Sequence, residues 1–90
     1  MNGVSRTVLI TNRRGLHARA SAKFVTLASQ QVAAVEVEKD GSIVTGTSIM
    51  GLMMLGAAMG DSVTISAKGD GAEAAVLVLT ELVEAKFGED

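Results

Sequence analysis

The sequence predicts an α+β fold, a two-layer open-faced sandwich in which helices cover one face of a four-stranded, largely antiparallel sheet. Three observations predict it. Four segments resemble half-buried strands, three segments carry apolar residues at helical spacing, and an Asp-Gly pair joins two of the strands. The elements follow one another in the order β-α-β-β-α-β-α. A chain of 90 residues, 48% of them hydrophobic, favours a single small domain over residues 1–90.

The first strand is predicted over residues 4–11, which are rich in β-branched side chains. The first helix is predicted over residues 18–29, because apolar residues recur there at i, i+4, i+7 and i+8 and so share one face. These residues are Ala20, Phe24, Leu27 and Ala28. Gly15, shortly before the helix, permits a bend of the backbone.

The middle of the chain predicts a hairpin followed by a short helix. Residues 32–38 form the second predicted strand, because valines alternate there with glutamates. The pair Asp40-Gly41 is typical of a tight turn and leads into a third strand over residues 43–45. A helix is predicted over residues 48–55, because Ser48 can cap its first turn. Its apolar side chains are Ile49, Leu52, Met53 and Leu55.

The last part of the chain predicts one more strand and one more helix. Apolar side chains alternate with polar ones in the strand, at Val63, Ile65 and Ala67. The helix is predicted to open at Asp70, because Glu73 three residues later completes a start that resembles a capping box. Its apolar stripe consists of Ala75, Val78, Leu79 and Leu82.

Composition excludes several classes of site. The chain has no cysteine and one histidine, so neither a disulfide framework nor an ordinary structural zinc site is expected, and no cofactor is predicted. The N-terminus lacks an apolar run behind a basic start, and the longest run of apolar residues and glycines, over residues 49–60, is too short to span a membrane. We therefore expect a cytoplasmic protein, and a monomer.

Charge is distributed unevenly along the chain. Residues 1–35 carry five basic residues and no acid, a formal charge of +5, whereas residues 36–90 carry a formal charge of −7. The basic part contains the single histidine, His17. A positive field of this kind attracts phosphates, acidic protein surfaces or nucleic acid, although a plain solvated surface explains the asymmetry equally well.

His17 lies at the predicted start of the first helix, where backbone amides lack acceptors and the helix dipole favours anions. Arg19 can turn its guanidinium group toward the same place and hold phosphate oxygens. A neutral imidazole keeps one lone pair for nucleophilic attack, so these groups could carry a phosphoryl group on histidine. Position alone does not decide this, because a single histidine beside a helix start is more often an ordinary surface or capping residue.

Other chemistries fit less well. No acid lies within eighteen positions of His17 to complete a catalytic triad, although folding could bring one close. The segment "GTSIMGLM" has the glycine spacing of a P-loop, but Leu52 and Met53 stand where lysine and serine or threonine are required. A nucleic-acid binding module remains a different-class alternative, weakened because the only aromatic residues are Phe24 and Phe87.

Two motifs carry a family resemblance. "GLHARASAKFV" and, some thirty residues later, "GTSIMGLMMLG" resemble the histidine-containing phosphocarrier HPr of the bacterial phosphoenolpyruvate-dependent phosphotransferase system, including its nitrogen-branch relatives. The resemblance implies a sheet of strand order 1-4-2-3. It also implies that His17 accepts a phosphoryl group on Nδ1 from phospho-enzyme I and passes it to a histidine of an enzyme IIA. Arg19 and the amides of Ala18 and Arg19 would contact the phosphate, and the protein would be a stoichiometric carrier rather than an enzyme.

The second motif implies regulation and docking. Ser48 matches the serine that an HPr kinase phosphorylates in many relatives, although without the resemblance it would be read as a helix cap. The resemblance assigns a partner-binding surface to Ala20, Ile49, Met50 and Met53. Flexible methionines suit a surface that accepts several partners.

The chain departs from the family at two places. Alanine stands at position 20, where the family usually has proline, and Thr26 and Ser29 replace lysines of many sugar-branch relatives. The sugar branch, the nitrogen branch and a purely regulatory role therefore all remain open. The resemblance implies enzyme I, an enzyme IIA and an HPr kinase as partners, and nucleic acid is not expected to be one.

Overall fold

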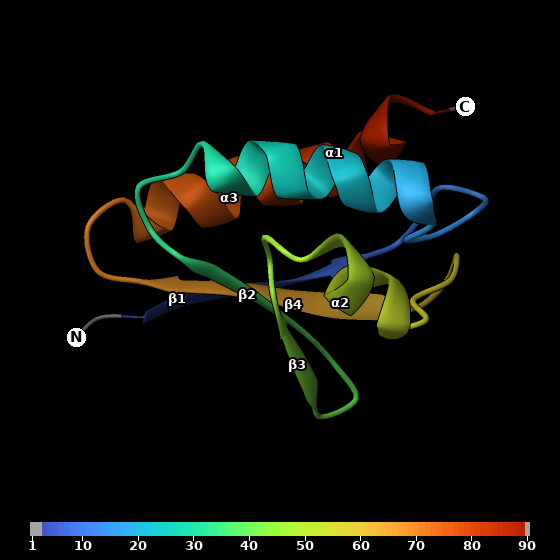
Figure 1. The fold of residues 1–90 in the computed structure, drawn as a ribbon, viewed down its shortest axis with the longest axis horizontal. Helices are drawn as coiled ribbons and strands as arrows, with labels where there is room; N and C mark the ends of the chain where they lie inside the picture. Colours follow the sequence, from blue (N-terminus) through green and yellow to red (C-terminus); the bar gives the residue numbers. More distant parts are fainter. Residues whose placement is uncertain (1–2, 90) are drawn as a thin grey trace.

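The computed structural model describes residues 3–89 and has the predicted architecture (Figure 1). A four-stranded antiparallel sheet has the order β1-β4-β2-β3, and helices cover one of its faces. Both the sandwich and the strand order 1-4-2-3 are thus confirmed. The elements are β1 (Gly3–Leu9), α1 (Ala18–Ser29), β2 (Val35–Lys39), β3 (Ser42–Thr45), α2 (Ile49–Met54), β4 (Ser62–Lys68), α3 (Ala72–Glu84) and a final 3-10 turn, η1 (Lys86–Gly88).

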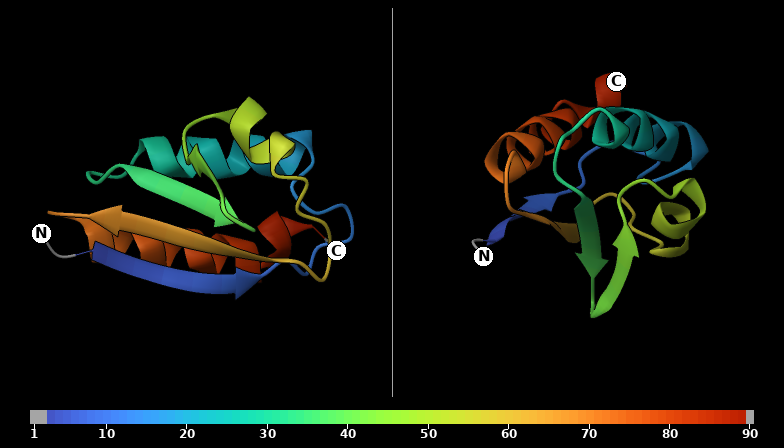
Figure 2. Two further views of the ribbon diagram at one scale, coloured as in Figure 1. Left: turned by 90° about the horizontal axis from the view of Figure 1, so that it is seen from below. Right: turned by 60° about the vertical axis from the view of Figure 1, so that its left-hand side comes forward.

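The central strand β4 pairs with β1 on one side and with β2 on the other. Its alternate residues Val63, Ile65 and Ala67 are buried, as the alternation predicts, and they belong to the hydrophobic core. Helices α1 and α3 lie together on one side of the sheet. Phe24 of α1 and Leu79 of α3 are also buried in this core. The two layers are visible edge-on in Figure 2. Aliphatic packing between the sheet and two helices therefore holds the fold together.

The predicted hairpin is present, with shifted strand ends. Asp40 and Gly41 have φ angles of 51° and 86°, the left-handed pair that a two-residue turn between right-twisted strands requires. The second strand begins at Val35 rather than at residue 32. Val32 is 85% exposed, because the chain is still turning away from the end of α1 at that point.

The start of α3 differs from the prediction. The helix begins at Ala72, and its N-cap is Gly71, at φ 81°, with no side-chain hydrogen bond. Asp70 therefore precedes the cap position, and the expected capping box with Glu73 is absent from α3. Backbone bonds close the turn instead, from the amide of Ala72 to the carbonyl of Gly69. The buried stripe shifts accordingly, with Val76 and Val83 fully buried where Val78 and Leu82 were expected to be.

Three loops meet at the end of the sheet where α1 begins. The amide of Ile10 donates to Asp61 at 2.8 Å, and the amide of Leu16 donates to Ala57 at 3.0 Å. These bonds tie the loop after β1 to the loop between α2 and β4. The C-terminal turn η1 returns from α3 to the same end of the molecule (Figures 1 and 2). No helix within residues 3–89 has the length and apolarity needed to cross a membrane.

Candidate phosphoryl-carrier site

His17 is the N-cap residue of α1, as its position in the sequence predicts. Its backbone is extended, with φ −73° and ψ 179°, and its carbonyl accepts the first helical hydrogen bond, from Ser21, at 2.9 Å. The approach to this position depends on Gly15, whose φ is 62°. A Cβ at Gly15 would lie 2.3 Å from the carbonyl oxygen of Ala57. Glycine is thus required both for the bend and for the close contact of the two loops.

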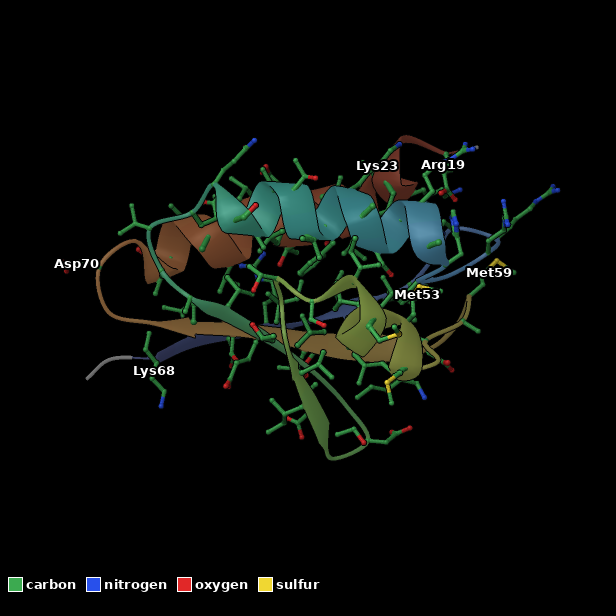
Figure 3. All side chains as sticks on the ribbon, viewed as in Figure 1. Arg19, Lys23, Met53, Met59, Lys68 and Asp70 are labelled. Carbon is green, nitrogen blue, oxygen red and sulfur yellow. The ribbon has the colours of Figure 1, made fainter. Side chains whose placement is uncertain are left out.

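The first turn of α1 is free to receive an anion. The side chain of His17 makes no capping bond, and the first turn contains no acidic residue. The amides of Ala18 and Arg19 are among those that have no acceptor within a helix, and the helix dipole adds positive potential there. Arg19 is exposed, and its side chain has no hydrogen-bond or ion-pair partner among residues 3–89. Figure 3 shows it at this end of α1, pointing away from the sheet.

The ring of His17 has an acidic neighbour that sequence reasoning missed. Its Nε2 atom lies 2.5 Å from Oε2 of Glu89, a residue 72 positions away. Only 14% of the His17 side chain and 19% of the Glu89 side chain are exposed, so the imidazole is more enclosed than expected for a surface histidine. No local pattern marks Glu89 in the sequence, because the contact depends on where α3 and η1 bring the end of the chain.

Asn12 holds the other oxygen of Glu89. Its Nδ2 group donates to Oε1 of Glu89 at 3.1 Å and to the carbonyl of Gly15 at 2.8 Å. Asn12 is completely buried. Because both of its acceptors are oxygens, the amide nitrogen must face them, which fixes the orientation of the side chain. Asn12 therefore links the bend at Gly15 to the carboxylate that contacts His17.

The C-terminal segment that carries Glu89 is anchored to the body of the domain. Phe87 is 1% exposed, and its carbonyl accepts a hydrogen bond of 2.7 Å from Nζ of Lys23 on α1. Lys86 and Phe87 both have positive φ angles, 58° and 56°, a conformation that L-residues adopt at a cost. Burial of the phenylalanine offsets that cost. Glu89 is thus placed by a packed segment.

The environment of Glu89 favours its ionised form. Partial desolvation raises the pKa of Glu89, but the hydrogen bonds from Asn12 and His17, together with the charge interactions with His17 and Lys23, outweigh it. The net result is a pKa below the ordinary value of 4.5. At neutral pH the group is therefore a carboxylate, which can only accept hydrogen bonds.

The second motif forms α2, beside the start of α1. Ser48 is its N-cap, and its hydroxyl accepts a hydrogen bond of 2.9 Å from the amide of Gly51, as expected for a cap. Leu52 and Leu55 are buried in the core. We call three exposed apolar residues of the helix the α2 patch: Ile49, Met50 and Met53, which are 41%, 70% and 44% exposed. Met54, at the end of the same helix, is also exposed, at 78%.

Ala20 is not at the surface. It is 0% exposed and packs in the core, because it lies on the face of α1 that also carries Phe24. Its side chain therefore contributes to the domain's packing and is unavailable to a partner, contrary to the expectation. Met59, in contrast, is 58% exposed, and Figure 3 shows it at the same end of the molecule as Arg19 and Met53.

The arrangement joins a nucleophilic ring, unpaired helix amides and exposed cations. Such a set can accept a phosphoryl group on nitrogen and solvate its oxygens. Residues 3–89 contain no cluster of three metal-ligating side chains. Both phenylalanines are 1% exposed, so neither can stack against a nucleic-acid base.

Comparisons with known proteins agree with this geometry. Residues 4–85 match the family described as "PTS HPr component phosphorylation site". The phosphocarrier protein HPr of Neisseria meningitidis is 45% identical over 86 residues, covering 96% of this chain and 97% of the relative. The phosphocarrier protein NPr of Shewanella violacea is 39% identical and covers 99% and 98%. Solved HPr from Thermoanaerobacter tengcongensis has a TM-score of 0.90 at 47% identity, covering 100% and 99%. Sequence and fold thus agree over nearly the whole chain.

Proposed function

The chain belongs to the HPr family of phosphocarriers of the phosphoenolpyruvate-dependent phosphotransferase system, and we propose that His17 is the residue that carries its phosphoryl group. The observation that supports this most is the position of His17 as the N-cap of α1, with an extended backbone and no acid in the first helical turn. In this proposal residues 1–90 act as one phosphocarrier domain. It acts as a stoichiometric carrier, because it returns to its free form only after its phosphoryl group has passed to an acceptor.

The transfer is a substitution at phosphorus between two imidazoles. The lone pair of Nδ1 of His17 forms a bond to phosphorus, and the P–N bond of the phosphohistidine on enzyme I breaks, leaving its electron pair on the donor ring. The amides of Ala18 and Arg19 and the guanidinium group of Arg19 then receive the phosphoryl oxygens. The same steps with an enzyme IIA histidine as acceptor return His17 to its free form.

Docking requires a surface next to His17, and the α2 patch fits that need. The patch is apolar, exposed and adjacent to α1, whereas Leu52 of the same helix and Leu55, its C-cap residue, are buried in the core. We propose that enzyme I and an enzyme IIA both bury this patch. Methionine side chains adapt to more than one partner, which a carrier with a donor and an acceptor needs. This role also assigns the chain to the cytoplasm.

The test is incubation with phosphoenolpyruvate and enzyme I from the same cell, followed by intact-protein mass spectrometry. We expect one acid-labile phosphoryl adduct on wild type, none on His17→Ala, and slower labelling of Arg19→Ala, because backbone donors still hold the phosphate. Undiminished labelling of well-folded His17→Ala would refute the assignment. A nucleic-acid binding module would remain unmodified. Offering the labelled protein to a sugar-branch and a nitrogen-branch enzyme IIA in parallel identifies the branch.

Ser48 is a second proposed modification site. A phosphate on its hydroxyl would add about −1.5 to −2 charges directly beside the α2 patch, and a docking partner would have to desolvate that charge. Ser48→Asp should therefore raise the concentration of carrier needed for half-maximal phosphorylation by enzyme I, without changing the rate at saturation. If Ser48→Asp behaves as wild type and an HPr kinase leaves wild type unlabelled, Ser48 is only the cap of α2.

A further inference from the structure

We propose that Glu89 is a positioning residue for phosphoryl transfer: its carboxylate holds a proton on Nε2 of His17, which leaves Nδ1 as the nucleophile. The proposal rests on the proposed function of His17 and goes beyond it by assigning a role to the end of the chain. Glu89 lies four residues outside the stretch, residues 4–85, that matches the family. The contact between Nε2 and Oε2, at 2.5 Å, is the observation that carries it.

The ionisation of Glu89 determines which ring nitrogen carries the proton. A carboxylate has no hydrogen to donate, so in this contact Nε2 of His17 must be the donor. A neutral imidazole carries one proton, and if that proton is on Nε2 the lone pair is on Nδ1. A histidine without this contact would distribute its proton between both nitrogens. Glu89 therefore raises the fraction of rings that are ready to attack through Nδ1.

The carboxylate is held firmly enough to do this. Oε1 accepts from the buried amide of Asn12, so that Oε2 is directed to the imidazole. On the other side, Phe87 anchors the segment in the core and Lys23 binds its carbonyl. The ring is thus fixed between the N-cap backbone and a carboxylate whose own position is set by three other residues. Preorganisation of this kind reduces the reorganisation that transfer requires.

Glu89 also matches the charge that develops on the ring. When Nδ1 forms its bond to phosphorus, it gives up its lone pair, and the Nε2 proton stays in place, so the ring becomes cationic. The adjacent carboxylate stabilises that charge. No proton is taken up or released, and the proton on Nε2 is available for the ring to become neutral again when the phosphoryl group leaves. The negative charge sits at Nε2, whereas the phosphate oxygens face the amides of α1 and Arg19.

Two readouts separate this role from a structural one. In the first, long-range proton–nitrogen NMR of nitrogen-15 protein reports the tautomer of the neutral His17 ring. We expect predominantly Nε2–H in wild type and a mixture of tautomers in Glu89→Gln, whose amide can either accept or donate. Glu89→Asp, which keeps the carboxylate, should lie between them. The control is Glu84→Gln, which removes an equal charge from the exposed end of α3 and should keep the wild-type tautomer.

The second readout is steady-state phosphorylation by enzyme I. Loss of one charge-assisted hydrogen bond should lower kcat of Glu89→Gln roughly tenfold, with little change of KM. Circular dichroism verifies the fold of each variant. The proposal is overturned if the wild-type ring is not predominantly Nε2–H. It is also overturned if Glu89→Gln keeps the wild-type tautomer and the wild-type kcat. The NMR experiment uses no phosphoryl donor, so its result does not depend on the proposed function. If the ring is Nε2–H but enzyme I does not label the protein, the proposed function of His17 is refuted instead.

Discussion

Gly15→Ala should be far more destabilising than its modest change in size suggests. The residue is left-handed at φ +62°, and a Cβ there would meet only backbone atoms: the carbonyl oxygen of Ala57 at 2.3 Å and Cα of Ala58 at 2.9 Å. Gly56 provides a matched control, because its φ is +64° and a Cβ there would meet nothing within 4 Å. Both variants incur the cost of a left-handed alanine, about 1–2 kcal/mol. Only Gly15→Ala must also separate two loops.

That separation breaks the hydrogen bond from Leu16 to Ala57 and disturbs the packing of the buried Leu16 side chain. Adding about 1 kcal/mol for the bond and a similar amount for packing gives a total loss of about 3–4 kcal/mol for Gly15→Ala. Urea unfolding should be followed by far-ultraviolet circular dichroism, because the chain has no tryptophan or tyrosine. Equal losses of unfolding free energy in the two variants would refute the steric argument.

Three further outcomes follow from the structure. Thr80→Val should raise the free energy of unfolding by about 1 kcal/mol, because the buried Thr80 hydroxyl has no partner among residues 3–89; a loss in urea unfolding would contradict this. Met50→Lys should raise KM for enzyme I roughly tenfold, whereas Val32→Lys should not, because Val32 is also exposed (85% against 70%) but follows the end of α1 that is far from His17; equal effects would disprove a specific patch. Since the folded pKa of Glu89 is lowered, its carboxylate stabilises the fold above pH 4.5, and the advantage of wild type over Glu89→Gln should be lost as pH falls below 4.5 and through the lowered pKa of the folded state. An advantage that is unchanged across this range would show that ionisation of Glu89 does not matter.

Local patterns sufficed for the parts of the fold that depend on local chemistry. Helix α1 spans the residues that its apolar spacing predicts, and the Asp40-Gly41 turn has the left-handed pair that its residue types favour. The N-cap of α2 is Ser48 for the same reason. The beginning of α3 was predicted wrongly, since a glycine in a left-handed conformation can cap a helix through the backbone and leave no side-chain signature.

The site was predictable only in part. His17 and Arg19 are two positions apart in the sequence, so their placement at a helix start could be inferred from periodicity alone. The contact of Glu89 with His17 joins residues 72 positions apart and depends on the packing of α3, Phe87 and Lys23. Ala20 was assigned to the surface by resemblance, although its helical phase already put it on the core face with Phe24.

The role of His17 as the phosphoryl carrier is tested by determining which of its ring nitrogens is bonded to phosphorus. Nitrogen-15 protein phosphorylated with phosphoenolpyruvate and enzyme I would be studied by phosphorus and long-range proton–nitrogen NMR at a pH that preserves the adduct. We expect a single phosphoryl group on Nδ1 and a retained proton on Nε2. A phosphoryl group on Nε2, or on a residue other than His17, would contradict it.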